Sequence, residues 1–391
     1  MRALLVAGLL ALSAACADDR AAPAVPEGGR IPRGWVRVRL AESEQVELGC
    51  DGRWAALDLL GSELGSDASL PRATPLVASE RGVRLGPLTL DTPTVELRPA
   101  RDGDLRVNGR AYRGVMRIER LPGLPGQAAR VRVTNLLPVD AYLRSVVPGE
   151  MPGTFGLTAL SAQAVAARSY ALNEMQERGW LWPDQRSQVY AGIDDESRLT
   201  DQAVQDTHGL LLVHDGKVLP AWFHSTCGGS TRPAREVYPF PPPGVFEDSV
   251  SCDDCRDSPF WRWTRSVPAE RAAEAFGLEQ PQLVSVSSDP HVWPAYAERV
   301  RLRTPAGESE LDAETFRVRV SRDQRRASSL LSTYWIAPPA IENGKLVVRG
   351  GGWGHGVGLC QYGAAGAAAR GLDARAILRR YYPGAQLVRL Q

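Results

Sequence analysis

The first third of the chain alternates apolar and polar residues. Residues 35–40 alternate apolar side chains with arginines, and the stretches 83–97, 114–120 and 130–134 show similar patterns. A period of two is typical of strands with one buried face, and glycines and prolines separate the stretches. The pattern therefore predicts a β-rich part over residues 35–134 that serves as a scaffold.

A helical pattern replaces this alternation in residues 135–172. Apolar residues four positions apart give the first predicted helix one apolar face. Pro148 and Gly149 are expected to end this helix, because proline lacks the amide hydrogen and glycine frees the backbone. A second, alanine-rich helix is predicted from about residue 157 onward, with Arg168 late on it. Two helices joined by a bend thus form this segment.

The predicted bend carries one carboxylate, Glu150, between Pro148 and Pro152. Proline also restricts the unfolded chain, so orienting a carboxylate on such a bend costs little entropy. A general acid or base is one interpretation of Glu150. A helix-capping or solvated carboxylate is the alternative, since structural carboxylates also occur near helix starts.

The rest of the chain mixes strands, loops and short helices, so the expected fold class is α+β. Residues 135–391 are predicted to form a mixed α/β lobe with a cleft, and residues 232–345 an insertion lobe that starts with a proline-rich loop. The length of 391 residues allows cores of useful size. A net charge of +1 gives no sign of a nucleic-acid-binding surface.

A glycine-rich run follows at 350–358. The lysine and serine or threonine of a phosphate-binding loop do not follow it, so that interpretation is weak. Glycine also lets a backbone pass close to a ligand, and we expect this run to border a groove. Trp353 would offer a stacking face and His355 a hydrogen-bond donor, although Trp353 in the core is an alternative.

Residues 1–16 have the features of an export signal. A positive start, an apolar run at 4–12 and small residues lead to Cys16. This order predicts a lipoprotein signal with lipid on Cys16, although Ser13 stands where leucine is usual. Residues 17–34 would form a flexible tether. The mature protein would then be exported and held at a membrane by its lipid, facing the periplasm or cell wall; secretion without lipid is the alternative.

Five cysteines remain besides Cys16, and an odd number excludes complete intramolecular pairing. Two short pairs, His224-x2-Cys227 and Cys252-x2-Cys255, offer one imidazole and three thiolates. That set matches a closed structural zinc site. A disulfide at Cys227 is the competing interpretation, because an exported protein permits one. No other motif calls for a cofactor.

Several motifs in a fixed order connect these segments to a known family. They read DAYL (140–143), VPGEMP (147–152), AQAVAARSY (162–170), QVYAG (188–192), HSTCGG (224–229), GWGHGVG (352–358), QYG (361–363) and YYPG (381–384). In this order the chain resembles the stage II sporulation protein D or amidase enhancer (SpoIID/LytB) family, from about residue 36 to the C-terminus.

The resemblance implies binding to peptidoglycan glycan strands and, as in some members, their cleavage by a lytic transglycosylase reaction. Glu150 would be the one catalytic acid and base. The residues expected to bind the substrate are Arg168, Gln188, Tyr190, His224, His355 and Gln361. A structural salt bridge is the alternative for Arg168.

Two other functions compete with this one. The family also contains amidase enhancers, which bind the cell wall without cutting glycan and stimulate a separate cell-wall amidase. A zinc hydrolase centred on His224 ranks last, because three cysteine ligands leave no obvious open coordination position.

Overall fold

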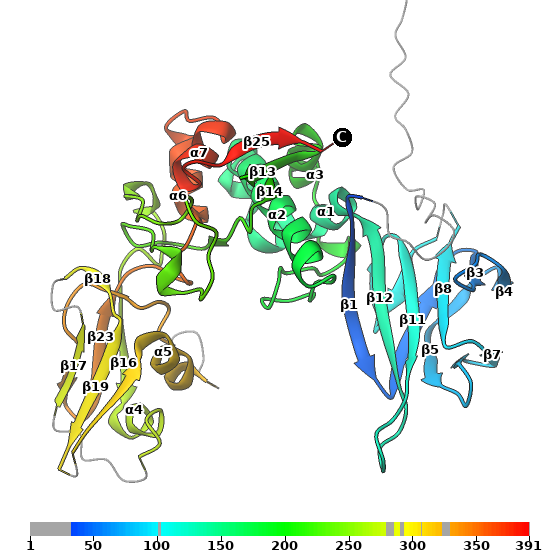
Figure 1. The fold of residues 1–391 in the computed structure, drawn as a ribbon, viewed down its shortest axis with the longest axis horizontal. Helices are drawn as coiled ribbons and strands as arrows, with labels where there is room; N and C mark the ends of the chain where they lie inside the picture. Colours follow the sequence, from blue (N-terminus) through cyan, green and yellow to red (C-terminus); the bar gives the residue numbers. More distant parts are fainter. Residues whose placement is uncertain are drawn as a thin grey trace, which may run out of the picture. The chain divides into compact units, whose positions relative to one another are not determined.

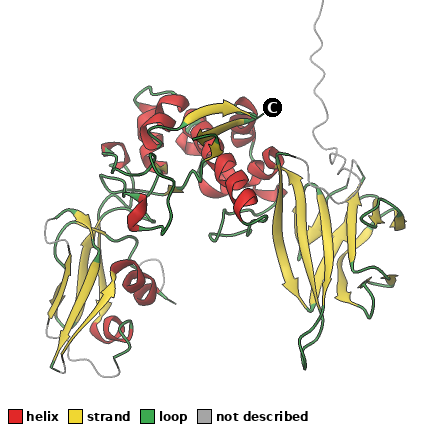
Figure 2. Ribbon diagram, viewed as in Figure 1, coloured by secondary structure: helices red, strands yellow, loops and turns green. Residues whose placement is uncertain are grey.

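Figures 1 and 2 show the computed structural model, which describes residues 33–100, 103–278, 285–289, 293–305, 307–322 and 329–390. Helices and strands are both abundant, so the expected α+β class is confirmed. The described chain divides into two compact units, one of Leu40–Leu137 and one of Arg33–Arg39 with Pro138–Gln391. The predicted export signal, the lipid site at Cys16 and nearly all of the expected tether lie outside the described residues.

Strands make up the first unit, as the alternating pattern predicts. They are β1 (Trp35–Ser43), β2 (Gln45–Cys50), β3 (Trp54–Leu57), β4 (Glu63–Asp67), β5 (Leu70–Ala78), β6 (Val83–Leu85), β7 (Leu88–Leu90), β8 (Thr94–Pro99), β9 (Leu105–Val107), β10 (Arg110–Tyr112), β11 (Val115–Leu121) and β12 (Arg130–Pro138). One sheet has the order β1-β12-β11-β8-β3-β4 and the other β10-β9-β2-β5-β6-β7. Val131 and Val133 are buried while Arg130 and Arg132 are not, which is the signature of a strand with one buried face.

Helix α2 (Leu157–Glu177) is the centre of the second unit. Every residue in 159–169 is buried, which is expected of a helix covered on all sides. Small alanine side chains allow this close packing against α1, α3, α6, α7 and β13. The elements around α2 are α1 (Val139–Glu150), η1 (Gly153–Phe155), η2 (Ile193–Asp195), α3 (Arg198–Asp206), β13 (Leu210–His214), β14 (Lys217–Val218), β15 (Phe223–His224), η3 (Ala234–Glu236), η4 (Asp253–Cys255), β24 (Leu359–Cys360), α6 (Gln361–Ala369), α7 (Ala374–Tyr381) and β25 (Gln386–Arg389).

Helix α1 is longer than the sequence predicts. It continues through Pro148 and ends at Glu150, so Pro148 does not stop it. A proline this close to the end disturbs little of the helix, because only the preceding turn must accommodate its ring and missing amide hydrogen. The amide of Met151 still donates to the carbonyl of Val147, over 2.9 Å. Glu150 is therefore anchored on a helix end and not on a free bend.

Residues 263–350, which overlap most of the expected insertion lobe, contain a hydrophobic core that includes Trp263, Phe316, Trp335 and Val348. One sheet has the order β16-β23-β21-β18 with β22 paired to β23, and a second has the order β17-β19-β20. The lobe consists of β16 (Trp263–Pro268), α4 (Ala269–Glu274), β17 (Ser285–Asp289), β18 (Ala295–Tyr296), β19 (Arg299–Thr304), β20 (Gly307–Asp312), α5 (Ala313–Ser321), β21 (Tyr334–Trp335), β22 (Ala340–Glu342) and β23 (Lys345–Gly350).

The glycine-rich run packs against the protein itself, which corrects the expectation that its glycines make room for a ligand. Gly352 has a φ of +79°, and a Cβ on it would lie 2.6 Å from the carbonyl oxygen of Thr226. A Cβ on Gly358 would collide with the backbone of Trp222. These glycines therefore allow the run to lie directly on the segment around β15.

None of the helices in the described part of the chain combines the length and the apolar character needed to cross a membrane.

Candidate functional site

The side chain of Glu150 is held at the end of α1 by one hydrogen bond. The amide of Val189 donates to Glu150 Oε1 over 2.7 Å. The carboxyl group is largely removed from water, and this burial raises the pKa of Glu150 from 4.5 to about 7, against the opposing effect of the Val189 amide. A carboxyl group with such a pKa can both donate and accept a proton near neutral pH.

The turn that supplies this amide, residues 188–192, is fixed to α1 and α2. Ser145 Oγ accepts hydrogen bonds from the amides of Ala191, over 3.1 Å, and Gly192, over 2.9 Å. The hydroxyl of Tyr142 donates to Gln188 Oε1, and Gln188 Nε2 donates to the carbonyl of Ala167. The position of Glu150 thus depends on contacts made by two helices.

Gln188 and Tyr190 were expected to bind substrate, and the structure places both inside the protein. Gln188 is fully buried and its amide oxygen and nitrogen both have protein partners. Tyr190 is 2% exposed, and its ring centre lies 4.9 Å from that of Tyr142. These two side chains hold the turn in place and do not form its surface.

Arg168 does not take the expected position at a binding surface. Its side chain is fully buried, and its Nε donates to Asp140 Oδ1 over 2.7 Å. The other guanidinium nitrogens donate to the carbonyls of Val204 and Leu210. Burial lowers the pKa of Arg168, and the Asp140 carboxylate opposes this effect. The structure therefore favours the alternative, a structural salt bridge that joins α1, α2, α3 and β13.

His224 and His355 lie close together in the second unit. Strand β15 pairs with β24 in parallel, with His224 opposite Cys360. His224 Nδ1 donates to the carbonyl of Val357 over 3.1 Å, and His355 Nε2 donates to the carbonyl of Phe223 over 2.9 Å. The two ring centres are 5.5 Å apart. Burial lowers the pKa of His224 to about 3 and that of His355 to about 4, so both rings are neutral at pH 7.

Gln361, at the start of α6, follows the Cys360 that pairs with His224 and contacts α2. Its Nε2 lies 3.5 Å from Gln163 Oε1. Within the described residues, Gln163 Nε2 and His224 Nε2 are buried polar atoms without a hydrogen-bond partner in the protein. A buried polar atom of this kind is expected to bind water or a ligand. Gln163 belongs to the AQAVAARSY motif, but only the folded structure shows that its side chain lies next to that of Gln361.

Helix α2 brings the two groups of residues together. The Gln163 side chain contacts Gln361, while one turn later the Ala167 carbonyl binds Gln188, the neighbour of Val189. Residues four apart lie on the same helix face. The structure thus places the turn that binds Glu150 and the side chain of Gln361 along one helix, although 211 residues separate Glu150 from Gln361 in sequence.

Residues that follow Glu150 in the chain line an aromatic pocket that sequence reasoning missed. Its volume is about 430 Å³, and η1, the start of α2 and α6 form its walls. The ring centres of Phe155 and Tyr362 are 4.7 Å apart in an edge-to-face arrangement. Aromatic rings in a pocket offer apolar faces to a ligand. Tyr362 lies in the QYG motif, but no pattern in the sequence linked it to Phe155.

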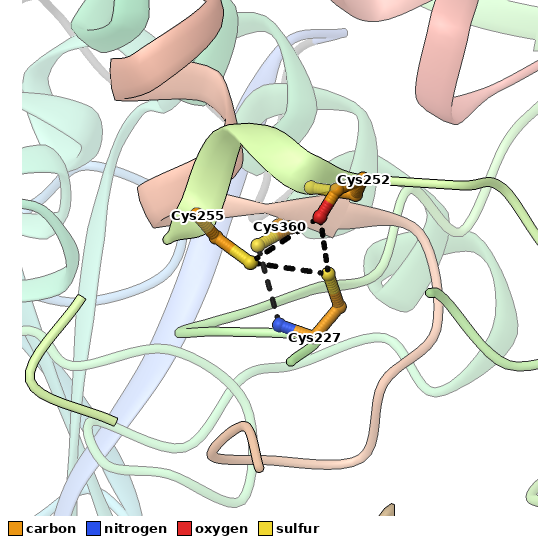
Figure 3. Close-up of side chains that lie close together, drawn as sticks. All are labelled: Cys227, Cys252, Cys255 and Cys360. Atoms are coloured by element: carbon orange, nitrogen blue, oxygen red, sulfur yellow. Dashed lines mark hydrogen bonds between the residues drawn. The ribbon is translucent and has the colours of Figure 1, made fainter. Parts of the chain in front are cut away.

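Four buried cysteines form a compact group, shown in Figure 3. The Sγ atoms of Cys227, Cys252, Cys255 and Cys360 all lie within 4.8 Å of one another. The spacing of the two short pairs predicted His224 as the fourth member, and the structure places Cys360 there instead. The reason is that the imidazole of His224 is turned to the Val357 carbonyl, while Cys360 opposite it on β24 faces the other thiols.

Comparison with known proteins supports the family expectation. A family model described as stage II sporulation protein matches residues 127–214, which include Glu150 and the turn at 188–192. The chain is 30% identical over 266 residues to an uncharacterized protein of Brachyspira hyodysenteriae, an alignment that covers 66% of this chain and 68% of that protein.

Two relatives have descriptive names. Stage II sporulation protein D of Bacillus subtilis is 29% identical over 282 residues, with 67% of this chain and 77% of that protein covered. The amidase enhancer of Bacillus subtilis is 26% identical over 288 residues, with 63% of this chain and 40% of that protein covered. The motifs keep their order in this chain and the family model covers the Glu150 segment. The chain therefore belongs to the stage II sporulation protein D and amidase enhancer family.

Proposed function

We propose that this protein binds the glycan strands of peptidoglycan and cleaves them in a lytic transglycosylase reaction, with Glu150 as the one catalytic acid and base. The observation that carries the proposal is the state of Glu150. Its pKa is about 7, and its carboxyl group accepts a hydrogen bond from the Val189 amide. The chain that follows it, from η1 to the start of α2, lines an aromatic pocket.

A transglycosylase on muramic acid needs only one such group. Most glycosidases use two carboxylates, one of which acts as nucleophile or activates water. In the proposed reaction, protonated Glu150 gives its proton to the glycosidic oxygen, and the bond from that oxygen to C1 breaks. The C6 hydroxyl of the same muramic acid then attacks C1 and gives its proton to ionised Glu150. The product has a 1,6-anhydro end, Glu150 is protonated again, and no water is consumed.

The remaining groups would bind and orient the sugar chain. Neutral His224 has an Nε2 without a protein partner, and its backbone pairs with Cys360, the residue before Gln361. The side chains of His224 and Gln361 can exchange hydrogen bonds with hydroxyl and acetamido groups. Phe155 and Tyr362 offer apolar faces to sugar rings. Within this proposal, Gln188, Tyr190 and Arg168 act indirectly, by holding α1, α2 and the 188–192 turn.

The similarity to the amidase enhancer of Bacillus subtilis favours one alternative. Under it the same surfaces bind the cell wall without cutting glycan, and the partner is a separate cell-wall amidase. Incubation of purified peptidoglycan with this protein, with an amidase, and with both distinguishes the two functions. Anhydro ends made by this protein alone support cleavage. Faster release of stem peptides in the mixture, without anhydro ends, supports the alternative.

We also propose that the protein is exported and held at a membrane by lipid on Cys16, since an apolar run and small residues precede this cysteine. Cys16→Ser should move the protein to the soluble fraction or block its processing. Unchanged membrane association and unchanged mature mass in this variant would rule out the lipid.

A further inference from the structure

We propose that Cys227, Cys252, Cys255 and Cys360 together bind one zinc ion in a closed, tetrahedral site. The four residues come from three separate parts of the second unit, and all are at most 1% exposed. Figure 3 shows the side chains approaching one another from the turn after β15, from η4 and from the end of β24.

The spacing of the sulfur atoms fits a zinc ion. Zinc–thiolate bonds are about 2.3 Å long, which places the sulfurs of a tetrahedral site roughly 3.8 Å apart. All four Sγ atoms lie within 4.8 Å of one another, and those of Cys227 and Cys255 are 3.5 Å apart. Small side-chain adjustments suffice to bring them into a regular tetrahedron around an ion.

Hydrogen-bond donors surround the sulfurs as they do in metal–thiolate sites. The amides of Cys227 and Gly363 both donate to Cys360 Sγ, over 3.3 Å each. The hydroxyl of Tyr381 lies 3.0 Å from Cys252 Sγ and can donate to it. The Sγ atoms of Cys227 and Cys255 lie 3.9 and 3.6 Å from the Cys252 carbonyl, and Cys360 Sγ lies 3.8 Å from the Ser225 carbonyl. The donors to Cys252 and Cys360 would stabilise these two sulfurs as thiolates.

The backbone around the group is also fixed. Asp254, between two of the cysteines, pairs with Arg370 and Arg380 and so ties η4 to the ends of α6 and α7. Gly363 cannot carry a side chain, because its Cβ would collide with Tyr381 and with Cys252 Sγ. The cysteines are thus brought together by contacts that do not depend on their own sulfurs.

A site with four thiolates has no open position for substrate or water. The ion would therefore hold structure together and take no part in catalysis. It would connect the turn after His224, η4 and the helix that begins with Gln361. Two of these segments carry the residues proposed to bind glycan, so an effect of the ion on glycan binding rests on the proposed function. Zinc binding itself does not.

The first test measures metal and thiols in the full chain, purified without chelator. We expect about one zinc ion per chain by elemental analysis. The four thiols should react with an alkylating reagent only when the protein is unfolded and a chelator has removed the zinc. Absence of zinc, or disulfides among these four cysteines by mass spectrometry, would overturn the proposal. Neither result depends on glycan cleavage, so failure here and failure of the proposed function are distinguishable.

The second test identifies the ligands with variants. Cys360→Ser should weaken zinc binding the most, while Tyr381→Phe, which removes only a donor to sulfur, should weaken it roughly 10–100-fold. His224→Ala and Cys50→Ser should keep one zinc per chain, since neither side chain belongs to the group. If Cys360→Ser fails to fold, cobalt bound to the wild-type chain provides the same information, because the intensity of its sulfur-to-metal absorption reports the number of thiolates. Loss of zinc in His224→Ala, or cobalt bound by fewer than four thiolates, would contradict the site.

Discussion

At the scale of single residues, the proposed chemistry depends on how one carboxyl group is held. Glu150 ends a helix, is partly buried and has the Val189 amide as its hydrogen-bond donor. Burial disfavours the ionised form, and one amide does not fully compensate, so the pKa rises to about 7. The same burial that prepares the group for proton transfer should therefore cost stability when the group is ionised.

Replacement of Glu150 by glutamine tests this cost. The folded pKa is raised from 4.5 to about 7. The folded state thus favours the neutral carboxyl group, whose stabilising effect is complete below pH 4.5 and is lost as the pH rises through 7. A shift of this size corresponds to about 3 kcal/mol. Glu150→Gln should be more stable than wild type at pH 8 by up to this amount, and about equally stable at pH 4.

Urea unfolding at both pH values measures the difference. The exposed residue Glu177 lies in the same unit, so Glu177→Gln provides the control and should leave the pH dependence of stability unchanged. If Glu150→Gln is no more stable than wild type at pH 8, the carboxyl group is not buried in the way described.

The same pKa predicts a pH profile for glycan cleavage. The first proton transfer needs protonated Glu150, so kcat/KM should fall about tenfold per pH unit above pH 7. The carboxyl groups of the glycan titrate well below this range, so the substrate does not produce the decline. Initial rates of cleavage between pH 5 and 9 check this expectation, and a midpoint near 4.5 would contradict it.

Arg168 is predicted to matter for folding. Removing one partner of a buried ion pair typically costs about 3–5 kcal/mol, so Arg168→Ala should lose stability of this order. Arg186 pairs with Asp184 on the surface, with both side chains about half exposed, and such pairs contribute about 0–1 kcal/mol. Arg186→Ala is therefore the matched control in urea unfolding. Equal stability of the two variants would contradict the structural role of Arg168.

At the scale of elements, the turn at 188–192 must fit closely against the end of α1. A Cβ on Gly149 would lie 3.0 Å from the Val189 carbonyl oxygen, whereas a Cβ on Gly153 would meet no atom within 4 Å. Alanine favours a helix over glycine by about 1 kcal/mol, so propensity alone would make Gly149→Ala harmless. The close contact predicts the opposite for activity.

Gly149→Ala should displace the turn by a few tenths of an ångström and weaken the hydrogen bond from Val189 to Glu150. We expect a loss of roughly tenfold or more in glycan cleavage, since small misplacements of catalytic groups are costly. Gly153→Ala, four residues away, should cleave at nearly the wild-type rate. The same loss in both variants would show that the contact with Val189 is not the cause.

Sequence patterns predicted most elements but not their detailed contacts. Alternation predicted β1, β11 and β12, and alanine content predicted α2. Pro148 was expected to end α1, but the helix continues to Glu150. The sequence rule for proline considers only the local backbone and not the packing around the helix. Arg168 was expected at a binding surface but is buried. A motif shows that a residue recurs in a family, but it does not show which way the side chain points.

At the scale of the whole molecule, distance along the chain limited what the sequence could reveal. The spacing of two short pairs suggested His224 as a zinc ligand, and Cys360 was missed because it lies 105 residues after Cys255 and has no neighbouring ligand. Gln163 and Gln361 meet across α2 and α6, and no local pattern indicates this contact. The order of the motifs was nevertheless sufficient to predict the family.

The central claim is that Glu150 cuts glycan strands by itself. The most direct measurement is mass spectrometry of the products from glycan strands without stem peptides, treated with wild type or Glu150→Gln. Wild type should produce 1,6-anhydro ends, and the variant should bind the strands equally well but cut them about 10²–10⁴-fold more slowly. Anhydro ends formed at the wild-type rate by Glu150→Gln, or none formed by the wild type, would contradict the claim.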